Sequence, residues 1–263
     1  MHEGLYIAAS AGIKQQGKMD VIANNLANLN NTGFKKDGLV FKEMIPPFDR
    51  TNSLETARNV LLPADISNEN VAYVGINEFF TDHSQGNLTQ TGNTLDLGLD
   101  GDGFFKVDTP AGIRYTRNGN FRLDQQSRLV TQEGLPVVAA GGGPVLIDAV
   151  GGVISIAKDG TVSVGNGLEN AAVAEIELVT IKDKKGLQKD GSGLYQNMSD
   201  EAVEEPANGV SIRQGFLELS NVNSVEEMTD MISTMRAFEA YQKVIQAIDG
   251  ADEQSVNNIG RVG

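Results

Sequence analysis

The sequence predicts an α+β protein in which long N- and C-terminal helices pair as a coiled coil around an inserted all-β domain. Three observations lead to this prediction. Residues 220–248 carry an apolar stripe at helical spacing, residues 5–29 repeat apolar positions every seven residues, and the stretch between them consists of short alternating runs. We expect a terminal helical assembly domain at 1–33 and 219–263, an extended strand and linker at 34–75, and a central antiparallel β domain, a sandwich or barrel, at 76–218.

The C-terminal helix is predicted within Ser220 to Ile248. Ser224 and Glu227 form a capping box, in which the hydroxyl and the carboxylate satisfy N–H groups that the first turn leaves unpaired. No glycine or proline interrupts the run before Gly250. Apolar residues recur along one stripe: Val225, Met228, Met231, Ile232, Met235, Phe238, Tyr241, Ile245 and Ile248. Such a stripe requires another surface to cover it.

The N-terminal helix is predicted over residues 4–30 and supplies a candidate partner. Two columns spaced by seven run through it: Leu5, Gly12, Met19, Leu26 and Ala8, Gln15, Ile22, Leu29. Asparagines are concentrated at 24–31, where we expect their amides to bind neighbouring groups, because asparagine prefers caps and turns to helix interiors. Gly33 is suited to the left-handed conformation that ends a helix.

The middle of the chain is predicted to be extended and then β-rich. Residues 34–42 have a strand-like composition, and residues 45–75 have little periodicity, which indicates a linker or an excursion. Short period-two runs follow, separated by turn signals such as Asn118-Gly119 and Asp159-Gly160. Residues 196–210 are predicted to be a polar loop.

Composition excludes several classes of function. A net charge of −14 lacks the cationic excess that neutralises phosphates, so we expect no nucleic-acid partner. Without cysteine there are no disulfides or thiolate metal sites. The first residues lack the basic and apolar regions of a signal peptide, and no run reaches the roughly 18 apolar residues of a membrane span, so we expect no membrane insertion.

No catalytic or cofactor constellation is visible in the sequence. The two histidines, His2 and His83, leave almost no transition-metal ligands, and His83 is interpreted as structural. The segment 100–111 fails as a calcium loop, since Phe105 and Ala111 occupy the sixth and twelfth positions. Residues 141–144 lack the ending of a phosphate loop. We therefore expect a protein that is not an enzyme, with no cofactor and no metal.

The terminal stripes are instead interpreted as an assembly surface. They are rich in methionine, which suits adaptable contacts, and a hairpin of two helices would leave apolar and asparagine-rich surface uncovered. The predicted assembly interface consists of Leu5, Gly12, Met19, Ile22, Asn24, Asn25, Leu26, Asn28, Leu29, Met228, Met231, Ile232, Met235, Phe238, Tyr241, Ile245 and Ile248.

Four ordered motifs carry a resemblance to a known family. They are residues 22–35 (IANNLANLNNTGFK), 91–107 with TGNTLDL and GDGFFKV at its ends, 115–121 (YTRNGNF), and 214–223 (QGFLELSNVN) before the closing helix. Together they span nearly the whole chain and resemble the flagellar rod, hook and hook-associated axial proteins. With a single central domain, the chain is similar to the rod proteins. Residues 225–232 (VEEMTDMI) resemble the proximal rod member more than the distal one.

The resemblance implies a structural function. A rod subunit would stack helically around the export channel and transmit torque from motor to hook, with the terminal helices inside and the β domain outside. The implied partners are further copies, other rod subunits, ring or bushing proteins and the flagellar type III export apparatus. The implied location is the basal-body rod in the periplasmic space, without a cleaved signal peptide. The alternatives are a distal rod or hook-type subunit and, in a different class, a secreted β-rich adhesin or enzyme.

Overall fold

The computed structural model describes residues 2–44, 73–148, 152–165, 170–199, 203–207 and 209–259. Most of the predicted linker, residues 45–72, lies outside the described residues. The chain divides into two compact units. Unit 1 comprises Met1–Asn24, Gly38–Phe80 and Val225–Gly263, and unit 2 comprises Asn25–Asp37 and Thr81–Ser224. Within the described residues, no helix combines the length and the apolarity needed to cross a membrane.

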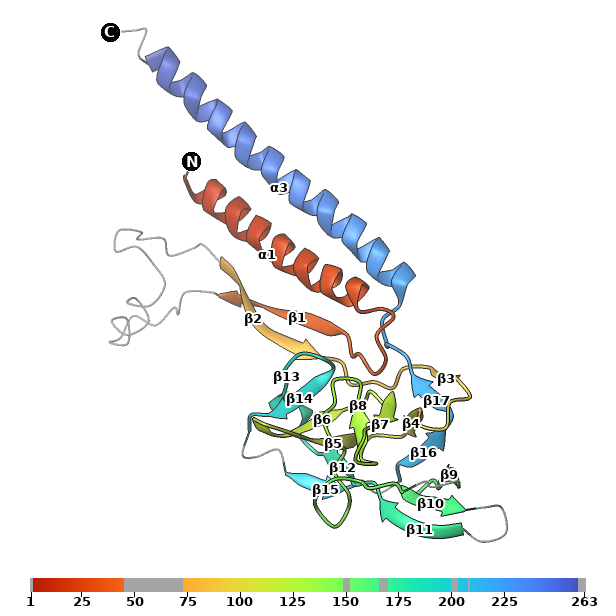
Figure 1. Ribbon diagram of the computed structural model, residues 1–263. Coiled ribbons are helices and arrows are strands. Elements are labelled where there is room, and N and C mark those ends of the chain that lie inside the picture. Colours follow the sequence, from red (N-terminus) through yellow and green to blue (C-terminus); the bar gives the residue numbers. More distant parts are fainter. Residues whose placement is uncertain are drawn as a thin grey trace, which may run out of the picture. The chain divides into compact units, whose positions relative to one another are not determined.

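Unit 1 is built on two long helices, α1 (His2–Ala27) and α3 (Ser224–Ile259), which lie side by side (Figure 1). The helices run antiparallel, because residue numbers that rise along α1 meet numbers that fall along α3. Three contacts show this direction: a Cβ at Gly4 would lie 3.5 Å from Ile248, a Cβ at Gly12 would lie 3.9 Å from Phe238, and Lys18 Nζ lies 3.8 Å from an Asp230 carboxylate oxygen. The predicted pairing of the terminal helices is confirmed.

The ends of both helices differ from the prediction, which gave 4–30 for the first helix and placed the second within 220–248. α3 continues through Gly250 to Ile259. A single interior glycine costs about 1 kcal/mol relative to alanine, which the helix-favouring neighbours Ala251, Glu253 and Gln254 can offset. At the other end, α1 stops at Ala27, and Gly33 adopts the predicted left-handed conformation with φ of 68°.

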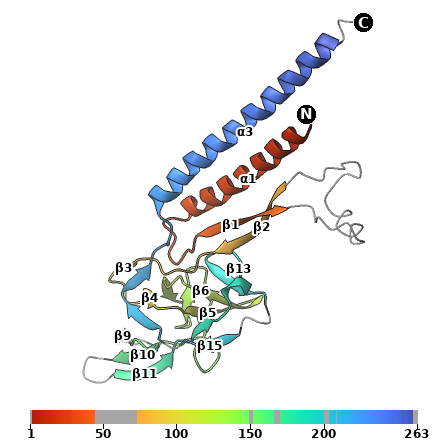
Figure 2. The same cartoon turned by 180° about the vertical axis from the view of Figure 1, so that it is seen from behind.

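Unit 1 also contains most of a two-stranded sheet made of β1 (Asp37–Met44) and β2 (Tyr73–Thr81). The extended conformation predicted after the helix is therefore confirmed. β1 lies along α1 (Figure 2), where the Lys14 ammonium sits 4.2 Å from the centroid of the Phe41 ring. This cation–π contact joins the strand to the helix.

Among its described residues, unit 2 is β-rich: apart from the end of α1 and one turn of 3₁₀ helix at Lys184–Gly186, its regular elements are strands, and its ladders are antiparallel, as predicted. Its largest sheet has six strands in the order β13-β14-β6-β5-β12-β15 and forms a half-barrel. A three-stranded sheet, β11-β10-β9, and three strand pairs, β16-β4, β17-β3 and β7-β8, complete it. The strands are β3 (Leu88–Gln90), β4 (Leu97–Asp100), β5 (Phe104–Thr109), β6 (Gly112–Thr116), β7 (Phe121–Leu123), β8 (Leu129–Thr131), β9 (Val153–Ile156), β10 (Thr161–Gly165), β11 (Asn170–Glu175), β12 (Leu178–Ile181), β13 (Leu187–Lys189), β14 (Leu194–Asn197), β15 (Glu204–Pro206), β16 (Ser211–Gln214) and β17 (Phe216–Glu218).

Alternation along several of these strands, such as β12, places every second residue in the core. The larger buried cluster gathers side chains from widely separated strands: Leu97, Leu99, Phe105, Phe121, Leu129, Val137, Val145, Ile147, Ile156, Val162, Ile176 and Ile212. A second cluster consists of Phe104, Tyr115, Val179, Ile181, Leu187 and Tyr195. The two rings of Phe104 and Phe105, adjacent in sequence, point into different clusters because successive strand residues face opposite sides.

Two predicted turns have different outcomes. Asp159-Gly160 closes a hairpin between β9 and β10, and Gly160 has a positive φ of 97°. Asn118-Gly119 instead carries the chain from one sheet to another, since β6 pairs with β5 and β14 whereas β7 pairs with β8. Glycine is required there by a close approach: a Cβ at Gly119 would lie 1.7 Å from the carbonyl oxygen of Leu97.

The polar loop predicted at 196–210 is wrong at its centre. Glu204, Glu205 and Pro206 form β15, which pairs with β12 at the edge of the six-stranded sheet. Edge strands tolerate proline and charged residues, so the composition of residues 204–206 did not indicate a strand. The Glu204 carboxylate also accepts hydrogen bonds from the Tyr115 hydroxyl and, at 2.9 Å, from Lys106 Nζ.

Candidate functional site

The apolar stripe of α3 divides into two faces. Met231, Phe238, Tyr241, Ile245 and Ile248 are partly buried, on the side from which Phe238 and Ile248 reach α1. Thr234, at the same helical phase, is buried and its hydroxyl has no hydrogen-bond partner within the described residues. This face is the intramolecular one.

The second face of α3 remains exposed. Val225, Met228, Ile232 and Met235 are 72%, 51%, 54% and 51% exposed, respectively. Their spacing of three, four and three residues puts them on one side of the first turns of the helix, about 120° from the face toward α1. We call these four residues the exposed stripe. The periodicity of the sequence did not separate the two faces, because the apolar residues of both recur with nearly the same helical period.

The predicted interface residues of the N-terminal segment have mixed environments; Leu26, Asn28 and Leu29 belong to unit 2, and the last two follow the end of α1. Ile22 and Gly12 are buried, and Leu5, Met19, Leu26, Asn28 and Leu29 are partly buried, whereas Asn24 is exposed. Asn25 belongs to unit 2 and is buried. The largest exposed apolar side chains of α1 are ones outside the predicted set: Tyr6, Ile7 and Ile13. α1 therefore exposes apolar side chains at positions that lie outside the two predicted heptad columns.

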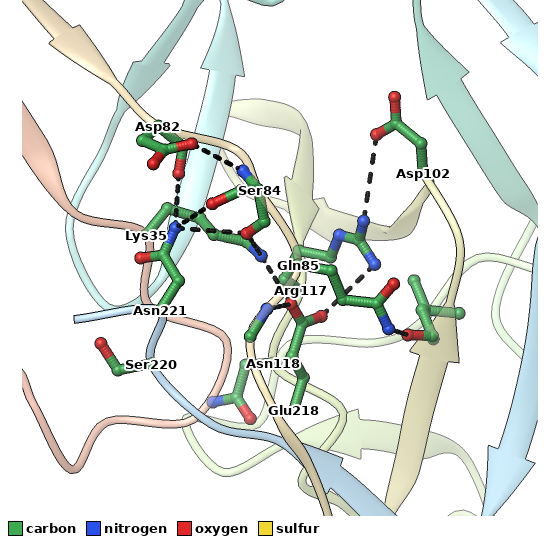
Figure 3. A network of polar contacts seen from close by, with 12 residues as sticks. Lys35, Asp82, Ser84, Gln85, Asp102, Arg117, Asn118, Glu218, Ser220 and Asn221 are labelled. Carbon is green, nitrogen blue, oxygen red and sulfur yellow. Dashed lines mark hydrogen bonds and ion pairs between the residues drawn. The ribbon is translucent and has the colours of Figure 1, made fainter. Parts of the chain in front are cut away.

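A buried charge cluster in unit 2 was not predicted. Lys35, Arg117 and Glu218 are each at most 2% exposed. Lys35 Nζ donates to Glu218 Oε1 at 2.5 Å, and a guanidinium nitrogen of Arg117 donates to Glu218 Oε2 at 3.3 Å (Figure 3). Each member has further partners. Glu218 Oε1 accepts the Gly86 N–H at 2.8 Å, and Lys35 Nζ donates to the Ser84 carbonyl oxygen at 2.7 Å.

The cluster joins three distant parts of the sequence through two cations and one carboxylate. Burial lowers the pKa of Lys35, and the Glu218 carboxylate opposes that shift. Burial likewise lowers the pKa of Arg117, again opposed by Glu218 and by Asp102, whose carboxylate lies 3.9 Å away. Because the surrounding medium is poorly polarisable, both cations depend on the one carboxylate.

Asn221 forms a second polar centre beside this cluster. Its side-chain oxygen accepts the Lys36 N–H at 2.7 Å, and its amide nitrogen donates to the carbonyl oxygens of Asp82 and Ser84 at 2.8 and 3.2 Å (Figure 3). One side chain thereby satisfies backbone groups of two segments, those after α1 and after β2. Such side-chain bridges replace a strand ladder where the backbone is irregular.

His83 lies in the same region and fits the structural interpretation. Its ring packs against Phe104 and Tyr195, with centroid distances of 5.9 and 5.4 Å, and within the described residues neither ring nitrogen has a hydrogen-bond partner. Burial lowers the pKa of His83 to about 4, and the nearby cations Lys184 and Lys35 act in the same direction. The imidazole is therefore neutral at pH 7. Among the described residues, no group of three or more His, Cys, Asp or Glu side chains is placed to hold a metal ion.

Sequence reasoning missed the charge cluster because its members are far apart. Lys35 and Glu218 are separated by 183 positions. The only available signal was that each lies within one of the motifs quoted above: Lys35 ends the first, Arg117 lies in the third, and Glu218 in the fourth. These three motifs thus meet in space at the charge cluster.

The fold and these sites define a class of protein: a structural subunit with paired terminal helices and an inserted antiparallel β region. Three family profiles match the chain. They are the flagella basal body rod protein profile at residues 5–35, the flagellar hook protein FlgE/F/G D1 domain at 98–164, and the flagellar basal body rod FlgEFG protein C-terminal profile at 213–259.

Whole-chain relatives agree with the profiles. The chain is 36% identical to flagellar basal-body rod protein FlgG of Bacillus subtilis over 268 residues, covering 98% of this chain and 99% of the relative. It is 36% identical to flagellar basal-body rod protein FlgF of Caulobacter vibrioides over 262 residues, covering 100% of both. It is 31% identical to FlgF of Rhizobium meliloti over 261 residues, covering 99% of both. The chain belongs to the flagellar basal-body rod protein family.

Membership of this family fixes the class of function. The chain is a structural subunit of the flagellar basal-body rod, of the FlgF/FlgG type, and is not an enzyme. The alternative of a secreted β-rich adhesin or enzyme is thereby excluded. The family also implies assembly with other rod subunits.

Proposed function

We propose that the chain assembles helically with copies of itself and with other rod subunits, and that the assembly is a drive shaft around the export channel. The observation that supports this proposal is the exposed stripe on α3, together with Tyr6, Ile7 and Ile13 on α1. Contiguous exposed apolar side chains usually mark interaction sites. Torque transmission requires the same interface to repeat between neighbours, which head-to-tail contacts provide.

The terminal helices are the proposed assembly elements. Complete burial of an aliphatic side chain contributes roughly 1.5–3 kcal/mol, so covering the exposed half of each stripe residue contributes about 1 kcal/mol. Four such residues together contribute about 4 kcal/mol to each contact, and the contact recurs at every subunit. The interface predicted from the sequence, from Leu5 to Leu29 and from Met228 to Ile248, is proposed to extend to the exposed residues of both helices.

The β region is proposed to form the outer layer, facing neighbouring rod subunits and the ring or bushing proteins. In this proposal the terminal segments 1–33 and 219–263 assemble, and residues 76–218 supply the outer surface. The acidic character of the chain, with a net charge of −14, supports solubility before assembly. Export through the flagellar type III apparatus is part of the same proposal and rests on family membership.

The proximal position in the rod is the one we propose, on the resemblance of residues 225–232 to the proximal member. The alternative is a distal rod subunit, because relatives named FlgG are as similar as those named FlgF. A hook-type subunit is a third possibility within the family. Complementation of two deletion strains with this chain, one lacking the proximal rod protein and one lacking the distal rod protein, distinguishes the first two. Restored motility of the strain without the proximal protein supports the proximal position. Restored motility of only the strain without the distal protein contradicts it.

Assembly itself is tested by interrupting the exposed stripe in the full chain. An aspartate at Ile232 is expected to abolish rod formation in a complemented deletion strain while the purified variant keeps its circular dichroism spectrum. Normal rods from this variant would refute the proposed interface. An aspartate at Ala240, an exposed position of α3 outside the stripe, is the matched control.

A further inference from the structure

The chain passes between the two units four times, and these crossings meet in one polar network of unit 2. The crossings lie at residues 24/25, 37/38, 80/81 and 224/225. Every contact described below is internal to unit 2. Relative motion of two units is the usual expectation unless their connection is restrained, so the way the crossings are held decides how stiff the connection is.

Asp37, which lies at the second crossing, forms hydrogen bonds with residues at the first and the third. Its backbone N–H and carbonyl oxygen each pair with the buried side chain of Asn25, both at 2.9 Å, which fixes the first crossing to the second. One oxygen of its carboxylate accepts the Thr81 hydroxyl at 2.7 Å, which adds the third crossing. The other carboxylate oxygen accepts Lys189 Nζ at 2.7 Å.

Asn221 attaches the fourth crossing to the others. It lies just before α3 and bonds to the Lys36 N–H and the Asp82 carbonyl oxygen, next to the second and third crossings. The backbone reinforces this arrangement, because the Asp82 N–H donates to the Lys36 carbonyl oxygen at 2.9 Å. Asp37 and Asn221 together therefore bring residues at all four crossings into one connected set.

The set is in turn fixed to the sheets of unit 2. Lys189, in β13 of the six-stranded sheet, donates to the Lys35 carbonyl oxygen as well as to Asp37, both at 2.7 Å. The Lys35 side chain is held by Glu218 of β17. The residues at the crossings are thus held by charged side chains that belong to two sheets of unit 2.

We propose that Asp37 and Asn221 form a joint that ties the four crossings together, so that twist passes between the units through four restrained connections at once. Each crossing lies within the terminal residues of one element, α1, β1, β2 or α3, and the ends of an element fray more readily than its interior, so a single crossing would be a weak restraint. Four connections fixed to one another cannot rotate independently. The purpose of the joint rests on the proposed torque-transmitting function, but its stiffness is a property of the monomer and is measured without assembly.

The experiment is a spin-label distance measurement on the full-length monomer. The chain contains no cysteine, so labels go only where cysteines are introduced. One label replaces Arg236, exposed on α3 in unit 1, and the other replaces Glu133, exposed in a turn of unit 2. With the joint intact we expect a narrow distance distribution. With Asp37→Ala or Asn221→Ala we expect the distribution to broaden roughly twofold or more, toward that of domains on flexible linkers.

Two controls separate the joint from general destabilisation. Asp190→Ala removes another ion pair of unit 2, with Arg114 at 2.6 Å, and Asn87→Ala removes an exposed asparagine; both should keep the narrow distribution. If Asp37→Ala fails to fold, Thr81→Val, which removes only the hydroxyl that donates to the Asp37 carboxylate, provides the milder variant. The proposal is overturned if the unmodified protein already shows the broad distribution, or if folded joint variants stay as narrow as the controls. Because the distances are measured on the monomer, normal rods formed with Ile232→Asp would refute the proposed interface without changing this result.

Discussion

The substitution Ile232→Asp separates folding from assembly most clearly. The side chain is 54% exposed on the face of α3 directed away from α1. Isoleucine and aspartate have similar helix propensities, and exposed substitutions usually change stability by about 0.5 kcal/mol or less. The monomer should therefore unfold at nearly the same denaturant concentration as the unmodified protein. Its helix content should also be unchanged.

The effect on the proposed interface should be much larger. Covering the exposed half of Ile232 contributes about 1 kcal/mol, and this contribution is lost. The new carboxylate must in addition be buried without a partner, which costs about 2 kcal/mol or more. A total of about 3 kcal/mol weakens each contact by roughly a hundredfold. Because every subunit in the rod repeats the contact, assembly should fail.

The assay combines a urea titration of the purified variant with electron microscopy of basal bodies from a complemented deletion strain. We expect an unchanged unfolding midpoint and absent or truncated rods. Ala240→Asp introduces the same charge on the same helix and should leave both readouts unchanged. Rods of normal length with Ile232→Asp, or an equal defect with Ala240→Asp, would show that the exposed stripe does not drive assembly.

Three further predictions concern unit 2. Glu218→Gln leaves the Lys35 ammonium buried without its carboxylate and should lower the free energy of unfolding by about 3 kcal/mol, measured by chemical denaturation. His83→Phe should flatten the pH dependence of the free energy of unfolding. Burial lowers the pKa of His83 from 6.5 to about 4, so the unfolded state binds more protons between these values, and the contribution of this histidine to the free energy of unfolding falls by about 3 kcal/mol on acidification from pH 7 to pH 4. Gly119→Ala should cost about 1–3 kcal/mol, since its Cβ would meet the Leu97 carbonyl oxygen.

Each of these has a specific control. For the charge cluster, replacement of Lys35, Arg117 and Glu218 together by methionine removes both cations along with the carboxylate and should recover part of the stability lost with Glu218→Gln; no recovery would mean that the buried charges are not the cause. For His83, an unchanged slope between pH 6.5 and 4 in the phenylalanine variant would contradict the assignment. For Gly119, the matched substitution is Gly141→Ala, where a Cβ meets nothing within 4 Å, and equal costs would refute the close approach.

The terminal helices could be predicted from sequence because their signals are local. The capping pair near Ser224 and the spacing of apolar residues concern neighbours within a few turns. The strands of unit 2 followed from alternation for the same reason. β15 could not be predicted, because Glu204 to Pro206 form a strand only through pairing with β12, which a local reading does not contain.

The division of the α3 stripe and the charge cluster depend on tertiary contacts. Met231 and Ile232 are adjacent, and only the position of α1 decides that the first is partly covered and the second exposed. A lysine after a helix and a glutamate in a strand both resemble surface residues in sequence. Their burial becomes evident only when the segments after α1 and before α3 meet.

The most direct test of the account is site-specific photo-crosslinking within assembled basal bodies. A photoreactive residue at Met228, Ile232 or Met235 is predicted to yield covalent adducts with rod subunits, because in the proposed assembly neighbouring subunits cover the exposed stripe. The same residue at Ala240 should give much lower yields. Absence of adducts at all three stripe positions in rods of normal length, or equal yields at Ala240, would contradict the claim that the terminal helices assemble the rod through this face.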